Sequence, residues 1–457
     1  MEKDLTHPSF NPDEALQARS IFRTALPLMA GLLLEQLIGL TDVLFLGRYG
    51  EVELAAAGVA GIYVMLLMMI GWGYCIGAQS MMGRANGAGD HARTGRIFRQ
   101  AALFLIAGGV AVTLLSFLFF DPVFGRSLGD GPVREAAWDY VFWRTAALPV
   151  AYLCILGRVF FVSILRARIL TWSSLVMVLV NCALNAVLIF GFGPFPEMGI
   201  AGAALASALA EFACLGVLFG RLAWERKWLE RCLRGSWAFE RGIQGELIRL
   251  GRWLMLQEAA AFGVWLFFFI AVEHAAGERG LAVSNVVRQL GAMLFLFVHA
   301  FGSTCGSVAA NLVGAGSPAR VPEAGRLGLK LCFCAIAPVA LVYLAFPEAV
   351  LGVLTDLPEV IEDAVPPYYV MLASYVLTVP CYFFFMMIEA LGCVKETFRT
   401  TVTAAAVYGL YIWLLTLVTT NTAVFWTSDF VFGAVMGIGS WIAWRRRSWE
   451  KSVEERV

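Results

Sequence analysis

The sequence predicts an all-α membrane protein with about twelve spanning helices, built as two six-helix repeats of the same orientation. Composition gives the first support, because 60% of the residues are apolar, only 15% are charged and the mean hydropathy is +0.74. A soluble chain carries about 25% charged residues. The 45 glycines suit membrane helices, in which glycine is more frequent than in soluble ones.

Apolar stretches of about 20 residues, the length that crosses the hydrocarbon core as a helix, recur along the whole chain. We place them near residues 25–47, 54–82, 98–120, 141–165, 171–193, 200–221, 249–271, 281–312, 327–353, 367–391, 400–420 and 424–444. A soluble protein with this many long buried helices would need an unrealistically large core. An even number of crossings also places both termini on one side of the membrane.

The charges of the connections predict which side that is. Basic residues gather within residues 83–100, 166–168, 221–252 and 445–447, whereas residues 346–369 contain no Lys or Arg. Excess Lys and Arg marks cytoplasmic loops. We therefore expect a multi-pass protein of the bacterial inner (plasma) membrane with both termini in the cytoplasm.

An internal repeat explains the even number of spanning helices. GEVELAAAG at residues 50–58 is similar to GERGLAVSN at 277–285, and GAG occurs at both 87–89 and 314–316. Both pairs are 227 residues apart (277 − 50 and 314 − 87). About six crossings separate the copies, so the halves are parallel repeats about an axis near the membrane normal, with a central cleft between them. Rocking of one lobe against the other would give alternating access.

The predicted organisation follows from this repeat. It comprises an N-terminal cytoplasmic extension (1–24), an N-lobe of six helices (25–222), a basic cytoplasmic linker (223–248), a C-lobe of six helices (249–444) and a cytoplasmic tail (445–457). Nothing in the sequence indicates an obligate partner, so we expect a monomer whose contacts are the lipid bilayer and a small-molecule substrate.

Two acids in the first spanning stretch are candidates for a site that couples transport to an ion. Glu35 and Asp42 are seven residues apart, almost two helical turns, so both project from one helix face. Gly31 and Gly39 flank Glu35 on that face and permit close approach of a neighbouring helix or a ligand. A charged residue in a membrane helix costs about 2.5–3.5 kcal/mol on insertion scales, so its presence needs a reason.

Polar residues of later stretches complete the candidate set. Asn181 and Asn185 are i,i+4 neighbours in the fifth stretch, and Ser207 and Glu211 are i,i+4 neighbours in the sixth. Carboxylate, amide and hydroxyl oxygens are ligands that a hard cation such as Na⁺ accepts, with Asp42, Asn181 and Asn185 as the candidate ligands. A carboxyl group removed from water can instead bind and release a proton. We add Gln36 and, in the seventh stretch, Glu258 to the cation and substrate candidates.

Structural roles for the same residues remain open. Glu35 could pair with an arginine such as Arg144 or Arg158, Asp42 could stabilise a helix end, and Glu211 could pair within its own lobe. Asparagines are also common as hydrogen-bonding contacts between membrane helices.

The motifs, taken together, resemble those of the multidrug and toxic compound extrusion (MATE) transporters over nearly the whole chain. The first stretch carries Leu26–Pro27 and EQLIGLTDVLFLGRYG, followed by ELAAAG. The loops ANGAGDHAR and LVGAGSPAR, and NCALNAVLIFGFG followed by PEMGIAGAALAS, are also similar to family patterns.

The resemblance implies a twelve-helix, two-lobe antiporter that uses H⁺ or Na⁺ to export organic, often cationic or amphiphilic, compounds. On it, Asp42 corresponds to a first-helix aspartate implicated in cation coupling, and Asn181 to the asparagine of the fifth-helix motif. Asn185 falls where members have aspartate or asparagine, and Ser207 where threonine is common. Pro27 matches a first-helix proline associated with helix bending, and a proline there removes a backbone hydrogen bond.

Departures from the family pattern affect the C-lobe. Sodium-driven members carry a seventh-helix glutamate, which aligns here with Ala261, one turn after Glu258, and a tenth-helix aspartate, which aligns near Cys381. A coupling site in the N-lobe and H⁺ rather than Na⁺ are therefore favoured, since one carboxylate and two amides would hold Na⁺ weakly unless Glu35 joins them.

Other function classes fit the sequence less well. A flippase for a lipid-linked or amphiphilic precursor is the alternative, but it predicts several cationic residues in the cleft. An enzyme is not expected, because the chain has no G-x-x-x-x-G-K-[ST] loop and its four histidines are scattered. Zero net charge argues against nucleic-acid binding. The ten cysteines lack metal-ligand spacing, and we expect no cofactor beyond the coupling ion.

Overall fold

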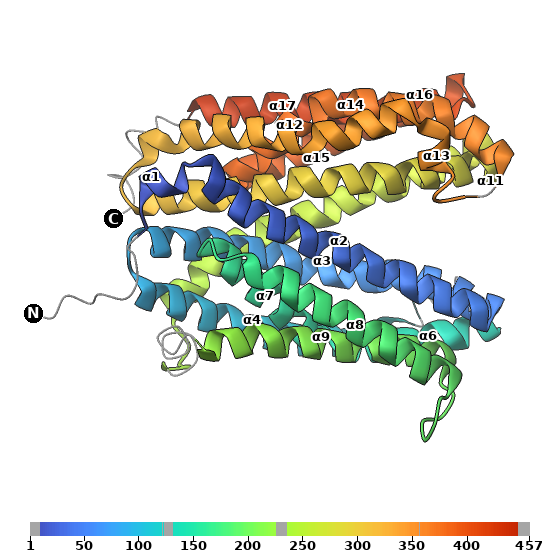
Figure 1. Cartoon of the computed structure of the whole chain (residues 1–457), viewed down its shortest axis with the longest axis horizontal. Helices are drawn as coiled ribbons and strands as arrows, with labels where there is room; N and C mark the ends of the chain where they lie inside the picture. The colour runs from blue at the N-terminus through green and yellow to red at the C-terminus, as the bar shows by residue number, and fades with distance from the viewer. Residues whose placement is uncertain (1–9, 121, 123–130, 225–234, 356, 447–457) are drawn as a thin grey trace, which may run out of the picture. The chain divides into compact units, whose positions relative to one another are not determined.

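The structure is a computed structural model that describes residues 10–120, 122, 131–224, 235–355 and 357–446. Within these ranges the chain is almost entirely α-helical and contains no strand (Figure 1). Parts of three predicted segments lie outside the described residues: 1–9 of the N-terminal extension, 225–234 of the linker and 447–457 of the tail.

The helices of the described chain account for twelve spans. Ten helices are long and apolar enough to cross a membrane, and the bent pair α6 (Pro132–Ala146) and α7 (Leu148–Ser163) supplies an eleventh. The helix α11 (Arg241–Gly314) has 74 residues, too many for one crossing at 1.5 Å per residue. It breaks at Gly277, whose φ of 68° and ψ of −168° suit glycine alone, so α11 contributes two spans. The predicted twelve-helix membrane fold is confirmed.

The chain divides into two compact units. The N-terminal unit consists of Leu26–Ala85 and Asp90–Met255. Its helices are α2 (Ala18–Tyr49), α3 (Glu51–Gly87), α4 (His91–Phe120), α6, α7, α8 (Arg168–Phe190) and α9 (Gly199–Trp224), together with the start of α11.

The C-terminal unit consists of Met1–Ala25, Asn86–Gly89 and Leu256–Val457. Its long helices are the rest of α11, α12 (Val321–Ala345), α14 (Pro358–Ala390), α15 (Val394–Val418) and α17 (Ser428–Arg446). Short helices connect or precede them: α1 (Pro12–Ala15), η2 (Pro318–Arg320), α13 (Pro347–Leu351) and α16 (Thr422–Trp426).

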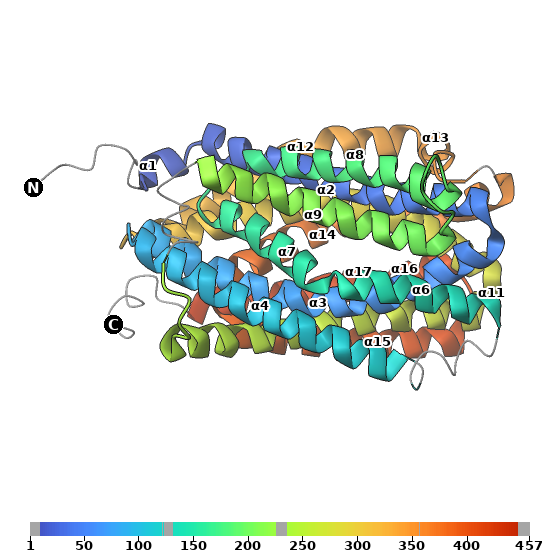
Figure 2. The same ribbon diagram turned by 90° about the horizontal axis from the view of Figure 1, so that it is seen from below.

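Helix α9 is central to the packing of the N-terminal unit. It packs against α6, α7 and α8, and Figure 2 shows α8 and α9 side by side over most of their length. A Cβ atom at Gly202 of α9 would lie only 2.6 Å from the carbonyl oxygen of Leu188 in α8, so the absence of a side chain permits this approach. In the C-terminal unit α14 and α17 form the corresponding close pair.

Prolines account for two differences from the predicted spans. The fourth span is bent by 50° between α6 and α7, where Pro149 in the first turn of α7 has no N–H to continue the helix. Helix α14 begins at Pro358 instead of near residue 367, and it includes Pro366 and Pro367. Pro366 and Pro367 lie in the third turn of the helix, where neither has the N–H that would bond to the carbonyl four residues earlier.

Candidate functional site

Asp42 of α2 lies among hydrogen-bond donors from α8 and α9. The side-chain amide of Asn185 donates to Asp42 Oδ1 at 2.6 Å, and that of Asn181 donates to the same oxygen at 3.2 Å. The hydroxyl of Ser207 donates to Asp42 Oδ2 at 3.0 Å. Both asparagines are fully buried, so the carboxylate is held by donors that are not competing with bulk water.

The same residues are also bonded to one another. Asn181 donates to Ser207 Oγ at 3.0 Å, and its own Oδ1 accepts from Asn185 at 3.2 Å and from Thr41 at 3.2 Å. Among the described residues, the buried Oδ1 of Asn185 has no hydrogen-bond partner. The network therefore contains a carboxylate and one unused amide oxygen, both of which attract a cation or a proton.

A seven-residue register between α2 and α8 places the acids. Asp42 contacts Asn181, and seven residues earlier on both helices Glu35 contacts Ser174, whose hydroxyl donates to Glu35 Oε1 at 3.1 Å. The two acids therefore project from one face of α2, as their spacing indicates. Gly31, one turn before Glu35, allows α2 to approach α8, because a Cβ atom there would lie 3.2 Å from Ser174 Oγ. Gly39 has no such neighbour.

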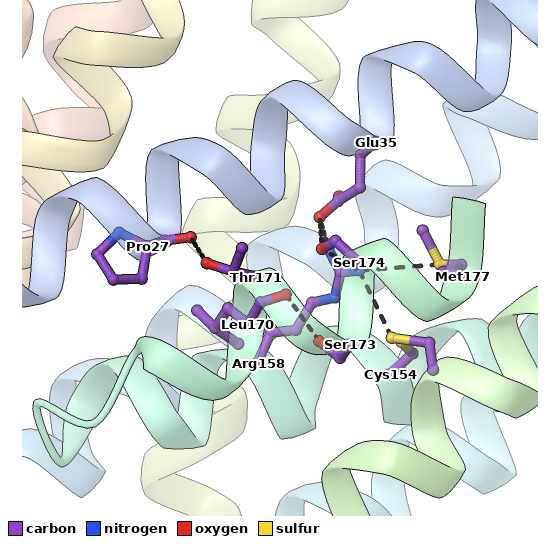
Figure 3. A network of polar contacts seen from close by, with 10 residues as sticks. Pro27, Glu35, Cys154, Arg158, Leu170, Thr171, Ser173, Ser174 and Met177 are labelled. Atoms are coloured by element: carbon purple, nitrogen blue, oxygen red, sulfur yellow. Dashed lines mark hydrogen bonds and ion pairs between the residues drawn. The ribbon is translucent and has the colours of Figure 1, made fainter. Parts of the chain in front are cut away.

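Glu35 forms an ion pair with Arg158 of α7 (Figure 3). Arg158 also donates to Ser174 Oγ at 3.3 Å, and its guanidinium lies 3.5 Å from the Sγ of Cys214. The side chains of Arg158 and Glu35 are 14% and 29% exposed, so the two charges compensate each other in a largely buried position. The ion pair expected as an alternative role for Glu35 is present.

Glu211 of α9 forms a second ion pair. Its Oε1 accepts from Arg144 Nη1 at 2.9 Å, with both side chains less than 15% exposed. Arg144 is also close enough to Asp42 for an electrostatic interaction. Tyr140 lies one turn before Arg144 on α6, and its charged neighbours are Asp42, Arg144 and Glu211. The Asp42 network thus extends through Ser207 and Glu211 on one face of α9 to an arginine.

Other predicted residues lie apart from this network. Gln36 is exposed on α2, and no hydrogen bond joins it to Asp42 within the described chain. Pro27 lies inside α2, and its carbonyl oxygen accepts a hydrogen bond from Thr171 of α8 at 2.9 Å (Figure 3). Glu258 lies on α11 in the C-terminal unit.

The surroundings of Glu258 include a residue that the sequence interpretation did not select. Glu389 of α14 is buried and accepts a hydrogen bond at 2.6 Å from the side-chain amide of Gln257. Glu258 is near enough to repel it electrostatically. The neighbouring pair Gln257–Glu258 in an apolar stretch was the available signal, but nothing in the sequence connected it to α14. Thr41 and Tyr140 were also not among the predicted site residues.

No group of three or more His, Cys, Asp or Glu side chains in the described ranges could hold a metal ion. The oxygen atoms around Asp42 come mostly from amide and hydroxyl groups. A monovalent cation or a proton is therefore the kind of ion that this network can accept.

Comparisons with known proteins agree with the fold. A family profile described as MatE matches residues 27–187 and 254–415. A FAD transporter of Shewanella oneidensis is 26% identical over 372 residues, covering 79% of this chain and 78% of its own length. The multidrug resistance protein NorM of Burkholderia vietnamiensis is 27% identical over 365 residues, covering 76% and 75%.

Solved structures are similar over almost the full length. The outward-facing conformation of a multidrug resistance MATE family transporter of the MOP superfamily matches with a TM-score of 0.87, covering 97% of this chain and 100% of that one, at 19% identity. A MOP superfamily transporter from Pyrococcus furiosus, described as having a binding pocket of reverse polarity, matches with a TM-score of 0.86 over 96% and 98% of the two chains, also at 19% identity. At this identity the likeness concerns the fold alone.

Proposed function

The chain belongs to the MatE family of membrane transporters, and we propose that it exports small organic compounds, cationic or amphiphilic in character, in exchange for protons. It is an integral membrane transporter that takes small-molecule substrates, not an enzyme. The proposal adds alternating access of two lobes, action as a monomer, and a bacterial plasma membrane location with both termini in the cytoplasm.

One observation carries the coupling mechanism: a membrane carboxylate, Asp42, is surrounded by three neutral donors instead of a cation that contacts it directly. Neutral donors stabilise the carboxylate without neutralising it. Asp42 therefore keeps a negative charge that a bound proton can cancel. Loss of this charge alters the hydrogen bonds that Asp42 accepts from Asn181 and Asn185 of α8 and from Ser207 of α9. Such a change in a helix contact provides the two states that coupling requires.

The orientation of the amides supports H⁺ over Na⁺. Both asparagines present N–H groups to Asp42, and Asn181 Oδ1 is already used by Thr41 and Asn185. Na⁺ would have to displace these N–H groups from Asp42, and of the two amide oxygens only the Oδ1 of Asn185 lacks a hydrogen-bond partner among the described residues. Coupling to Na⁺ bound at Asp42, Asn181 and Asn185 is the competing hypothesis, and the test below distinguishes it from coupling to H⁺.

The ion pairs support export of a solute over a lipid-linked flippase. A pyrophosphate-carrying lipid requires several unpaired cations, but Arg144 and Arg158, two arginines buried in the N-terminal unit, are each committed to a glutamate.

Reconstitution into liposomes tests the proposal. A pH gradient alone should drive uptake of a fluorescent organic cation, and a Na⁺ gradient alone should not. Asp42→Asn should reduce the gradient-driven rate to the level of protein-free liposomes. Glu51→Gln, which alters an exposed acid in the first turn of α3, is the matched control and should retain wild-type rates. Unchanged gradient dependence in Asp42→Asn would refute Asp42 coupling, and transport driven by Na⁺ alone would replace H⁺ by Na⁺.

A further inference from the structure

Arg288 in the second half of α11 is a cation without an ion-pair partner among the described residues of its unit. Its Nε is buried and makes no hydrogen bond, and no described residue of its unit forms an ion pair with its guanidinium. A charge in a spanning helix is costly and tends to mark a functional position. Arg144 and Arg158, by contrast, are each paired with a glutamate. The presence of the Arg288 charge in a spanning helix therefore remains to be explained.

One aromatic ring lies beside this guanidinium, and a second ring stacks on the first. Its Cζ lies 5.5 Å from the ring centroid of Phe269, on the preceding span of α11. Phe269 stacks on Trp265, with centroids 5.9 Å apart and an interplanar angle of 21°. The side chain of Trp265 is 44% exposed, so the platform is open to a further ring. An arginine beside stacked rings can bind a planar group and an acidic group at the same time.

Arg288 lies on a spanning stretch beside other polar residues. Arg288 is eleven residues beyond the break at Gly277, which is about 16 Å along the helix at 1.5 Å per residue. Arg288 therefore lies seven residues inside the span that the sequence predicts at 281–312. Asn285 and Gln289, adjacent on the same helix, are exposed polar residues, which contact with lipid tails would disfavour within a span.

We propose that Arg288, Phe269 and Trp265 form a substrate subsite for an aromatic anion, a planar ring system that carries a carboxylate, sulfonate or phosphate. The guanidinium binds the acidic group with two charge-assisted hydrogen bonds, and the ring of the ligand stacks on Trp265 and Phe269. If the bound compound is transported, the substrates of the proposed function include amphiphiles that carry a negative group. The subsite rests on the proposed function only for the statement that its ligand is a transported substrate.

Equilibrium binding to the purified full-length protein in detergent, without any ion gradient, tests the subsite. Two dyes with the same xanthene ring system but opposite charge, anionic fluorescein and a cationic rhodamine ester, are compared by fluorescence anisotropy. Arg288→Gln should weaken fluorescein binding about ten- to a hundredfold, the effect of losing a hydrogen bond to a charged group, and change rhodamine binding less than about threefold. Arg288→Lys should retain part of the fluorescein affinity, because it keeps the charge but loses the planar fork.

Arg279→Gln is the matched control. Arg279 lies on the same helix near Gly277, is exposed, and already pairs with Glu359 and Asp363, so its loss should leave fluorescein binding unchanged. Phe269→Leu should weaken both dyes, since stacking does not depend on ligand charge. Thermal stability of each variant, measured in the same detergent, separates loss of the subsite from loss of the fold.

Two results would overturn the subsite. One is a folded Arg288→Gln or Arg288→Lys variant that binds both dyes as the wild type does, or loses both equally. The other is displacement of fluorescein by phosphatidylglycerol micelles, which would make a lipid headgroup the ligand. Because no gradient is used, a failure of proton coupling appears only in the liposome experiment and leaves this measurement unaffected.

Discussion

The polar groups inside the two units are arranged differently. In the N-terminal unit, Asp42 has three neutral donors, and Glu35 and Glu211 each have an arginine. In the C-terminal unit, Glu389 has one amide donor and a second carboxylate, Glu258, nearby. Arg288 there has no ion-pair partner among the described residues of its unit.

In the N-terminal unit each of these acids has a hydrogen-bond donor or an arginine, whereas in the C-terminal unit two carboxylates lie near each other and Arg288 forms no ion pair with a described residue of that unit. A polar network in which most groups are paired holds them at defined positions, which suits a site for a proton or a small ion, and the Oδ1 of Asn185 remains available to it. Partly satisfied groups leave hydrogen-bonding capacity for a ligand. We infer that the N-terminal unit holds the coupling ion and that the C-terminal unit contacts the substrate.

The largest expected effect comes from breaking a buried ion pair of the N-terminal unit. Arg158→Gln leaves Glu35 charged and uncompensated, and we expect a loss of about 3 kcal/mol of stability, at the lower end for buried pairs because Glu35 is 29% exposed. Thermal unfolding of the detergent-solubilised protein measures it. The double variant Glu35→Leu with Arg158→Met should recover most of the stability. Arg279→Gln, in an exposed pair of the C-terminal unit, should leave the unfolding temperature nearly unchanged.

A smaller loss is expected from the close approach of α8 and α9 that supports the Asp42 network. Gly202→Ala places a methyl group 2.6 Å from the Leu188 carbonyl oxygen, and overpacking of this kind costs about 1–3 kcal/mol. Gly216→Ala on the same helix has no atom within 4 Å and should be neutral or slightly stabilising. Equal unfolding temperatures for both variants would show that the α8–α9 contact is not as tight as described.

Within the Asp42 network, the two amides should differ in their effect on transport. Asn185 makes the shorter bond to the carboxylate, 2.6 Å against 3.2 Å for Asn181. Asn185→Ala should lower proton-driven transport about tenfold, the effect of losing about 1.4 kcal/mol from a charge-assisted hydrogen bond. Asn181→Ala should lower it less, and initial rates in liposomes measure both. A larger effect for Asn181 would mean that its bonds to Ser207 and Thr41 matter more than its bond to Asp42.

The smallest effect is expected from a substitution of Glu258, the carboxylate of the C-terminal unit that the sequence predicts as a site residue. If the proton binds in the N-terminal unit, Glu258→Gln should change the proton-driven transport rate by less than about twofold. This is the size of effect expected for substitution of a polar residue without an essential role. Transport rates under an imposed pH gradient test this. Complete loss of coupling in this variant, with normal folding, would place an essential ion site in the C-terminal unit as well.

Much of the fold could be predicted because membrane insertion is a local property. Each span needs its own run of about 20 apolar residues, so hydropathy alone located twelve of them. Where local rules compete, the prediction was less accurate. The chain turns at the single residue Gly277 instead of over a longer loop, and α14 extends through Pro366 and Pro367, because packing of neighbouring helices compensates for lost backbone bonds.

The sequence by itself determined which polar residues lie in the membrane and which share a helix face. The seven-residue spacing of Glu35 and Asp42 and the four-residue spacing of Asn181 and Asn185 follow from helix geometry alone. Only the tertiary structure decided their partners: Glu35 with Arg158, Glu211 with Arg144, and Glu389 with Gln257. These pairs join residues 67 to 132 positions apart, and such contacts depend on how helices pack, which no local spacing records.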